Sequence, residues 1–184
     1  DYDQAEQWYQ RGRMLGEETR IPLVVARALC YLGTLACQQN QYWHAQKYLH
    51  SAFDIAVAHK ATPLILQIIA SAATLRLEEQ GRTCSSQLMQ NGHSPSDSTL
   101  LKVYECLSLI ADHPAARVET RQQAKTQLSK LAVSLPPASV ARLDSQTGVL
   151  EQAVDISLFD PAHDANLFKE LLLISKDDEP APIG

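Results

Sequence analysis

The chain has little of what marks a membrane, secreted or nucleic-acid-binding protein. It has only 7 glycines among 184 residues. No apolar run approaches the ~20 residues needed to cross a bilayer. Residues 1–4 have neither the basic flank nor the apolar segment of a signal peptide. A net charge of -5 provides no basic footprint for neutralising phosphates. These absences predict a cytoplasmic protein that binds neither membranes nor nucleic acid directly.

Signatures of catalysis and of metal binding are missing as well. The chain has no G-x-S-x-G motif and no glycine-rich phosphate loop. Its six histidines never lie three or four residues from another histidine or from a cysteine, so a zinc site would need ligands from separate helices. We therefore expect no catalytic residues, no bound metal and no cofactor, and we predict that the chain is not an enzyme.

The four cysteines lie within helical patterns, and none forms a C-x-x-C pair. They are Cys30, Cys37, Cys84 and Cys106. Free cysteine behaves as a small apolar residue, which predicts reduced, buried side chains and no disulfide framework. A redox-sensing pair of Cys30 and Cys37, seven residues apart on one helical face, is the alternative. Packing is favoured, because Arg27 is the one nearby basic residue that would favour a thiolate.

Amphipathic helical periodicity fills most of the chain. Apolar residues recur at helical spacing, and Pro22 and Pro63 each suit the first turn of a helix. Gly81 is expected to end one helix before a shorter, polar one begins. The pattern predicts an all-α protein with helices over about 3–18, 22–38, 42–59, 63–79, 83–90, 99–111 and 116–134.

A spacing pattern recurs along these helices, in which a small residue precedes a bulky one by four positions and a small or apolar one by seven. It starts at Ala5, Ala45, Cys84 and Ala124, at intervals of about 40 residues. Small residues allow two antiparallel helices to cross at about 8–10 Å. One hairpin cannot cover its own apolar face, so hairpins must stack on one another. The sequence therefore predicts an array of stacked hairpins with a 39–40-residue period.

We expect the array to occupy residues 1–159 and to end in two capping helices within 138–159. No polar cap precedes Ala5, so we also expect the array to continue toward the N-terminus in a longer protein. Residues 160–184 form a tail with an amphipathic helix over 165–175 and a disordered end. The apolar stripe of that helix predicts docking on the array or on a partner, including self-association.

The clearest hairpin pattern joins Leu32-Gly33-x2-Ala36 to Ala45-x3-Leu49-x2-Ala52. This pattern resembles the tetratricopeptide repeat, lengthened from about 34 residues. The segment from Leu107 to Pro137 is similar to the C-terminal end of tetratricopeptide-like sensor regions in large bacterial signal-transduction (STAND) NTPases and in regulators similar to the maltose-regulon activator. The resemblance covers about residues 3–159 and implies a right-handed solenoid of antiparallel helical hairpins.

The resemblance also implies a concave groove lined by the first helix of each hairpin. By position relative to Gly33 and Ala72, its lining residues would be Arg27, Cys30, Thr34, Cys37, Leu66, Ile69, Ala73 and Arg76. The implied function is a protein- or peptide-binding scaffold, the sensor or interaction part of a larger bacterial signalling or regulatory protein. The alternative is a small-molecule effector domain of a transcription regulator, with a pocket near Arg27 and Arg76.

Overall fold

The computed structural model describes residues 2–87 and 97–134, and every regular element within these ranges is an α-helix. The helices are α1 (Tyr2–Glu18), α2 (Pro22–Gln38), α3 (Tyr42–Ala58), α4 (Thr62–Gln87), α5 (Asp97–Asp112) and α6 (Val118–Ser134). The all-α prediction is confirmed for this part of the chain. The capping helices predicted within 138–159, the tail helix at 165–175 and the domain boundary near 160 lie outside the described residues.

The predicted end of a helix at Gly81 is wrong, because α4 continues through this glycine to Gln87. A single glycine inside a helix costs only about 1 kcal/mol relative to alanine. The segments predicted as two helices therefore form one.

The first three turns between helices share one geometry. Each contains a residue with a left-handed backbone: Arg20 (φ 54°), Asn40 (φ 62°) and Lys60 (φ 50°). In each turn the following N–H donates to a carbonyl five residues earlier: Ile21 to Gly16 (2.9 Å), Gln41 to Ala36 (2.8 Å) and Ala61 to Ala56 (2.9 Å). These are Schellman caps, which satisfy carbonyl groups left without partners at a helix end. Accordingly α1, α2 and α3 are equal in length, and the starts of α1 to α4 are evenly spaced along the chain.

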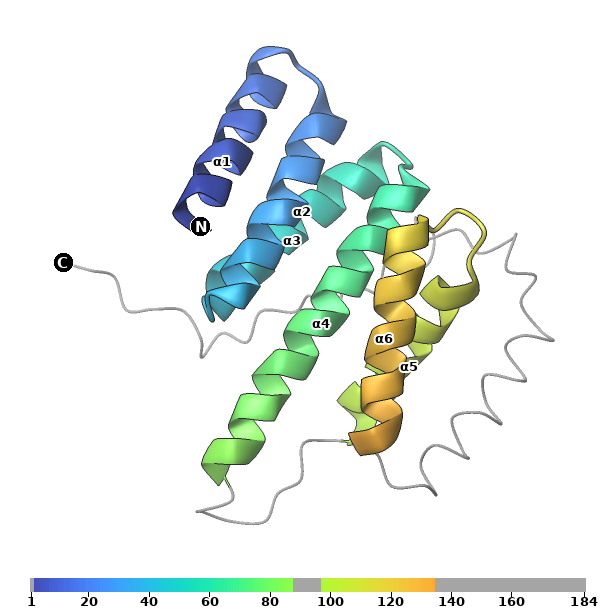
Figure 1. The fold of residues 1–184 in the computed structure, drawn as a ribbon. Coiled ribbons are helices and arrows are strands. Elements are labelled where there is room, and N and C mark those ends of the chain that lie inside the picture. The colour runs from blue at the N-terminus through green and yellow to red at the C-terminus, as the bar shows by residue number, and fades with distance from the viewer. Residues whose placement is uncertain (1, 88–96, 135–184) are drawn as a thin grey trace.

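The helices form two rows (Figure 1). Helices α2, α4 and α6 are neighbours in one row, and α3 and α5 form the other. Helix α3 packs against α2 and α4, α5 packs against α4 and α6, and α1 packs against α2. The core lies between the rows, where Phe53, Ile68 and Leu107 are fully buried. Helix α4 lies between neighbours and contacts α2, α3, α5 and α6.

Helices α2 and α3 approach most closely at Gly33. A Cβ atom there would lie 2.8 Å from Leu49 Cγ and 3.2 Å from the carbonyl oxygen of Ala45. Ala45 and Ala52 are fully buried. The small residues of this hairpin are thus required by close helix contact, as the pattern predicted.

The similar pattern in α1 lies in a different environment. A Cβ atom at Gly12 would meet nothing within 4 Å. The close contact is instead at Gly16, where a Cβ atom would lie 2.9 Å from Val25 Cγ2. Helix α1 therefore packs on α2 through Gly16 and leaves Gly12 uncovered.

Candidate functional site

Most side chains predicted to line a groove are enclosed by neighbouring helices. Those buried in the core are Cys30, Cys37, Leu66, Ile69 and Ala73. They lie on α2 and α4, which contact each other, and α4 also contacts α3, α5 and α6. At these positions the helix face is turned into the core, so the side chains supply packing rather than an open surface. A binding role for them stays a prediction.

The other three predicted residues are accessible. Arg27 is exposed on α2, and Thr34 and Arg76 are half-buried. The Arg76 guanidinium forms an ion pair with Glu79, with 2.8 Å between Nη1 and Oε2. The positive charge of Arg76 is therefore partly neutralised by its own helix.

A line of polar contacts connects the three helices of the first row. The Thr34 hydroxyl on α2 donates to the Cys30 carbonyl of its own helix at 3.0 Å, and its oxygen lies 3.4 Å from Ser71 Oγ on α4. On the same helix, Thr74 Oγ1 accepts from Gln123 Nε2 of α6, also at 3.4 Å. Ser71 and Thr74 are three residues apart and so lie on one face of α4. We call Thr34, Ser71, Thr74 and Gln123 the polar row.

The polar row is accessible and can form further hydrogen bonds. Thr34, Thr74 and Gln123 are half-buried, and Ser71 is buried beneath them. A hydroxyl oxygen has two acceptor positions, and a glutamine amide carries two N–H donors and an acceptor oxygen. The polar row therefore presents both hydrogen-bond donors and hydrogen-bond acceptors to a ligand lying across the three helices.

A second cross-helix contact lies beside this row. The Cys37 thiol on α2 donates to Glu78 Oε2 on α4 at 3.0 Å. Burial is the largest cause that raises the pKa of Cys37. The hydrogen bond to Glu78 and the charges of Glu78 and Glu79 raise that pKa further. Since the thiolate is the nucleophile and the metal ligand, Cys37 is held in its unreactive form.

The other described cysteines are similarly inert. Burial raises the pKa of Cys30 to about 12, although a hydrogen bond from Ser71 opposes the shift. Burial also raises the pKa of Cys106 to about 12. All three are free and buried, which confirms the predicted packing role for Cys30, Cys37 and Cys106.

Metal ligands do not converge in the described part of the chain. Within residues 2–87 and 97–134, no three side chains of histidine, cysteine, aspartate and glutamate lie together as a group that could hold an ion. No helix in those ranges has the length and apolar character needed to span a membrane.

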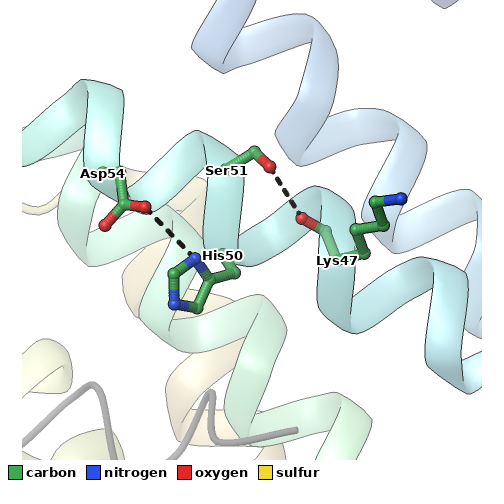
Figure 2. A network of polar contacts seen from close by, with 4 residues as sticks. All are labelled: Lys47, His50, Ser51 and Asp54. Carbon is green, nitrogen blue, oxygen red and sulfur yellow. Dashed lines mark hydrogen bonds and ion pairs between the residues drawn. The ribbon is translucent and has the colours of Figure 1, made fainter. Parts of the chain in front are cut away.

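The exposed side of α3 carries polar contacts of a different type (Figure 2). His50 Nδ1 lies 3.2 Å from Asp54 Oδ2, and the Ser51 hydroxyl donates to the Lys47 carbonyl at 3.0 Å. These contacts join residues four apart on one exposed helix, where such pairs contribute at most a few tenths of a kcal/mol. They stabilise α3 itself and connect it to no other helix.

His113 stabilises the turn between α5 and α6. The residue is 5 % exposed, and its Nδ1 accepts the backbone N–H of Ala115 at 3.1 Å. The His113 carbonyl accepts the N–H of Ala116 at 3.1 Å. An Nδ1 that accepts a hydrogen bond cannot carry a proton, and burial lowers the pKa of His113.

We expect the free energy of unfolding to fall as the pH drops below 6.5. The unfolded chain then binds a proton at His113 that the folded chain binds only at lower pH. This contribution is fully present above pH 6.5 and is lost as the pH falls toward the folded pKa. Urea unfolding between about pH 5 and 8 measures it. The variant His113→Gln should lose this part of the pH dependence, and equal slopes in both proteins would contradict the assignment.

Neither a scan against protein-family models nor searches of curated proteins and of solved structures finds a match to this chain.

Most of the polar row was missed from the sequence. Thr34 was named, but Ser71, Thr74 and Gln123 were not. The available signal was a serine and a threonine three residues apart within the largely apolar helix predicted at 63–79. This signal is weak, because a helical threonine can donate to a carbonyl four residues earlier, as Thr74 does to Ala70 at 3.0 Å.

Proposed function

We propose that the chain is a protein- or peptide-binding helical scaffold, a right-handed solenoid of tetratricopeptide-like hairpins. The even spacing of the first four helix starts and their shared turn geometry support a hairpin period of about 40 residues. The contacts between alternate helices, α2 with α4 and α4 with α6, support stacking of successive hairpins. By the resemblance, the scaffold is the sensor or interaction part of a larger bacterial signalling or regulatory protein.

The polar row is the observation that carries this proposal. It crosses α2, α4 and α6, while α3 and α5 pack behind these helices and hold them in place. An extended peptide exposes backbone N–H and C=O groups along its length. Threonine hydroxyls and a glutamine amide can pair with both kinds of group. The polar row would thus bind a segment of protein or peptide. We propose no catalytic step, no cofactor and no binding to a membrane or to nucleic acid.

Adjacent glutamines on α6 provide a matched test. Gln123 belongs to the polar row, whereas Gln122 is exposed and points about 100° away around the helix. We expect the immobilised chain and its Gln122→Arg variant to retain the same proteins from a bacterial cytosol. The Gln123→Arg variant should retain at least about tenfold less, the equivalent of 1.4 kcal/mol.

Thermal unfolding must first show that both variants are folded. Equal recovery by the folded Gln122→Arg and Gln123→Arg variants would show that the polar row is not the binding surface. Loss of recovery in both would place the binding surface elsewhere on α6.

A further inference from the structure

Glu78 lies on α4 one helical turn beyond the polar row. It follows Thr74 by four residues and Ser71 by seven, so the three residues share one face of the helix. Gln67, four residues before Ser71 and half-buried, continues this face toward the start of α4. The polar row is therefore part of a longer polar stripe along α4, to which Glu78 adds a negative charge.

The Glu78 carboxylate is held in place by a contact with α2. Its Oε2 atom accepts the Cys37 thiol at 3.0 Å. Cys37 is buried and α2 packs against α4, so the packing of the two helices fixes the position of this donor. A carboxylate has about four acceptor positions, and the thiol occupies one of them. Glu78 can therefore accept further hydrogen bonds without leaving its place.

The negative charge of Glu78 is accessible and is not neutralised by a neighbour. Glu78 is exposed, and none of the ion pairs of the described side chains includes it. The next residue, Glu79, differs in both respects, because it is half-buried and forms an ion pair with Arg76 at 2.8 Å. Two adjacent glutamates thus have different roles, one paired within the fold and one open to a ligand.

The exposed arginine on the same side of α2 is too distant to neutralise Glu78. Arg27 lies seven residues before Thr34, and Glu78 contacts α2 at Cys37, three residues after Thr34. Ten residues of helix separate the two levels by about 15 Å. This exceeds the screening length of about 8–10 Å at ordinary salt, so each charge acts separately on a ligand.

Glu78 is exposed although α4 is enclosed by other helices. In its row α4 contacts α2 on one side and α6 on the other (Figure 1), and α3 and α5 pack behind it. Each of these neighbours is in place, and the polar stripe is the side of α4 that they leave accessible.

We propose that the polar row binds a peptide that carries lysine or arginine, and that this positive side chain pairs with Glu78. The inference rests on the proposed function, because the peptide backbone must first lie on the polar row. One helical turn of about 5.4 Å separates Thr74 from Glu78, and the long side chain of lysine or arginine spans it. Successive side chains of an extended peptide point to opposite sides, so every second residue can point toward Glu78. An acidic residue there would be repelled.

A library of random peptides tests this preference without a known ligand. Neighbouring helices are about 8–10 Å apart and an extended residue spans about 3.3 Å, so about six residues cross from α2 to α6. The probe is a phage-displayed library of random peptides of twice this length, about 12 residues each. It is selected in parallel on the parent chain, Glu78→Gln, Glu78→Lys, Glu79→Gln and Gln123→Arg, after thermal unfolding has shown that each is folded.

We expect the peptides retained by the parent to contain about two- to fivefold more lysine and arginine than those retained by Glu78→Gln. This is the range expected of one solvent-exposed ion pair. The Glu78→Lys variant should instead enrich aspartate and glutamate. Glu79→Gln is the matched control, because Glu79 is already paired and points about 100° away around the helix. Its peptides should be as basic as those of the parent.

A double-mutant cycle then tests direct pairing. One retained peptide is synthesised with its basic residue and with glutamine in its place. The glutamine peptide should bind the parent about two- to fivefold more weakly, and the two peptides should bind Glu78→Gln equally. A merely structural role of Glu78 would weaken both peptides alike and would give no such coupling.

The outcomes separate this inference from the proposed function. Peptides that require Gln123 but are no more basic on the parent than on Glu78→Gln would overturn the pairing with Glu78 and leave the polar row as the binding surface. A basic preference that persists in Glu78→Gln would overturn it as well. If no retained peptide depends on Gln123, the polar row is not a binding surface, and both proposals are wrong.

Discussion

Replacing Leu49 with alanine is expected to lower the free energy of unfolding by about 2–5 kcal/mol. Leu49 is 0 % exposed, and its Cγ would lie only 2.8 Å from a Cβ atom at Gly33 of α2. The facing residue is Gly33, which has no side chain that could move into the space. The cavity therefore stays largely open, and its cost adds to the lost transfer energy of the deleted atoms.

Urea unfolding followed by circular dichroism measures this loss. Gln38→Ala is the control, because Gln38 is exposed at the end of α2 and should change the stability by less than about 0.5 kcal/mol. A loss below about 1 kcal/mol for Leu49→Ala would show that the α2–α3 contact is looser than the structure has it.

The first three turns explain why the helix boundaries could be predicted so well. The sequence pattern predicted a helix over 22–38, and α2 has these bounds. Pro22 begins this helix, and Asn40, one of the residues that most readily adopts a left-handed backbone, reverses the chain after it. Where local chemistry and hydrophobic periodicity agree, the boundary is specified by neighbouring residues alone. At Gly81 the local signal, a glycine, was present without the support of hydrophobic periodicity, and the prediction was wrong.

The candidate site was much less predictable, because it depends on how each helix is rotated about its axis. Thr34 and Ser71 are 37 residues apart, and Thr74 and Gln123 are 49 apart. No local pattern specifies which of their neighbours they will face. Periodicity places residues on a face, but the packing of α4 among four helices decides which face stays accessible. For this reason residues such as Leu66, expected in a groove, lie in the core.

The exposure of a helix depends on its place in the two rows. Each hairpin is closed by its own crossing and by the helix that follows, so every helix in the middle of the stack is covered on both sides. Helix α1 has the following helix, α2, but none of the described helices covers its other side as α2 covers α3. Trp8 on α1 is 65 % exposed, whereas Tyr48, 40 residues later on α3, packs against the core.

Gly33 and Gly12 should respond to leucine with opposite signs. At Gly33 the first atom of the new side chain would lie 2.8 Å from Leu49 Cγ and 2.9 Å from its Cδ2. The backbone carbonyl of Ala45, 3.2 Å away, blocks the remaining space. We expect Gly33→Leu to destabilise the chain by about 1–3 kcal/mol or more, because α2 and α3 must move apart.

Gly12 is the matched control, since it also lies inside a helix but faces open space. Gly12→Leu should stabilise the chain by up to about 1 kcal/mol, the difference in helix propensity. Thermal unfolding of both variants beside the parent measures the two effects. A Gly33→Leu variant as stable as Gly12→Leu would contradict the tight crossing at Gly33. Opposite signs would show that a glycine is required by close helix contact at Gly33, whereas at Gly12 it only lowers the helix propensity.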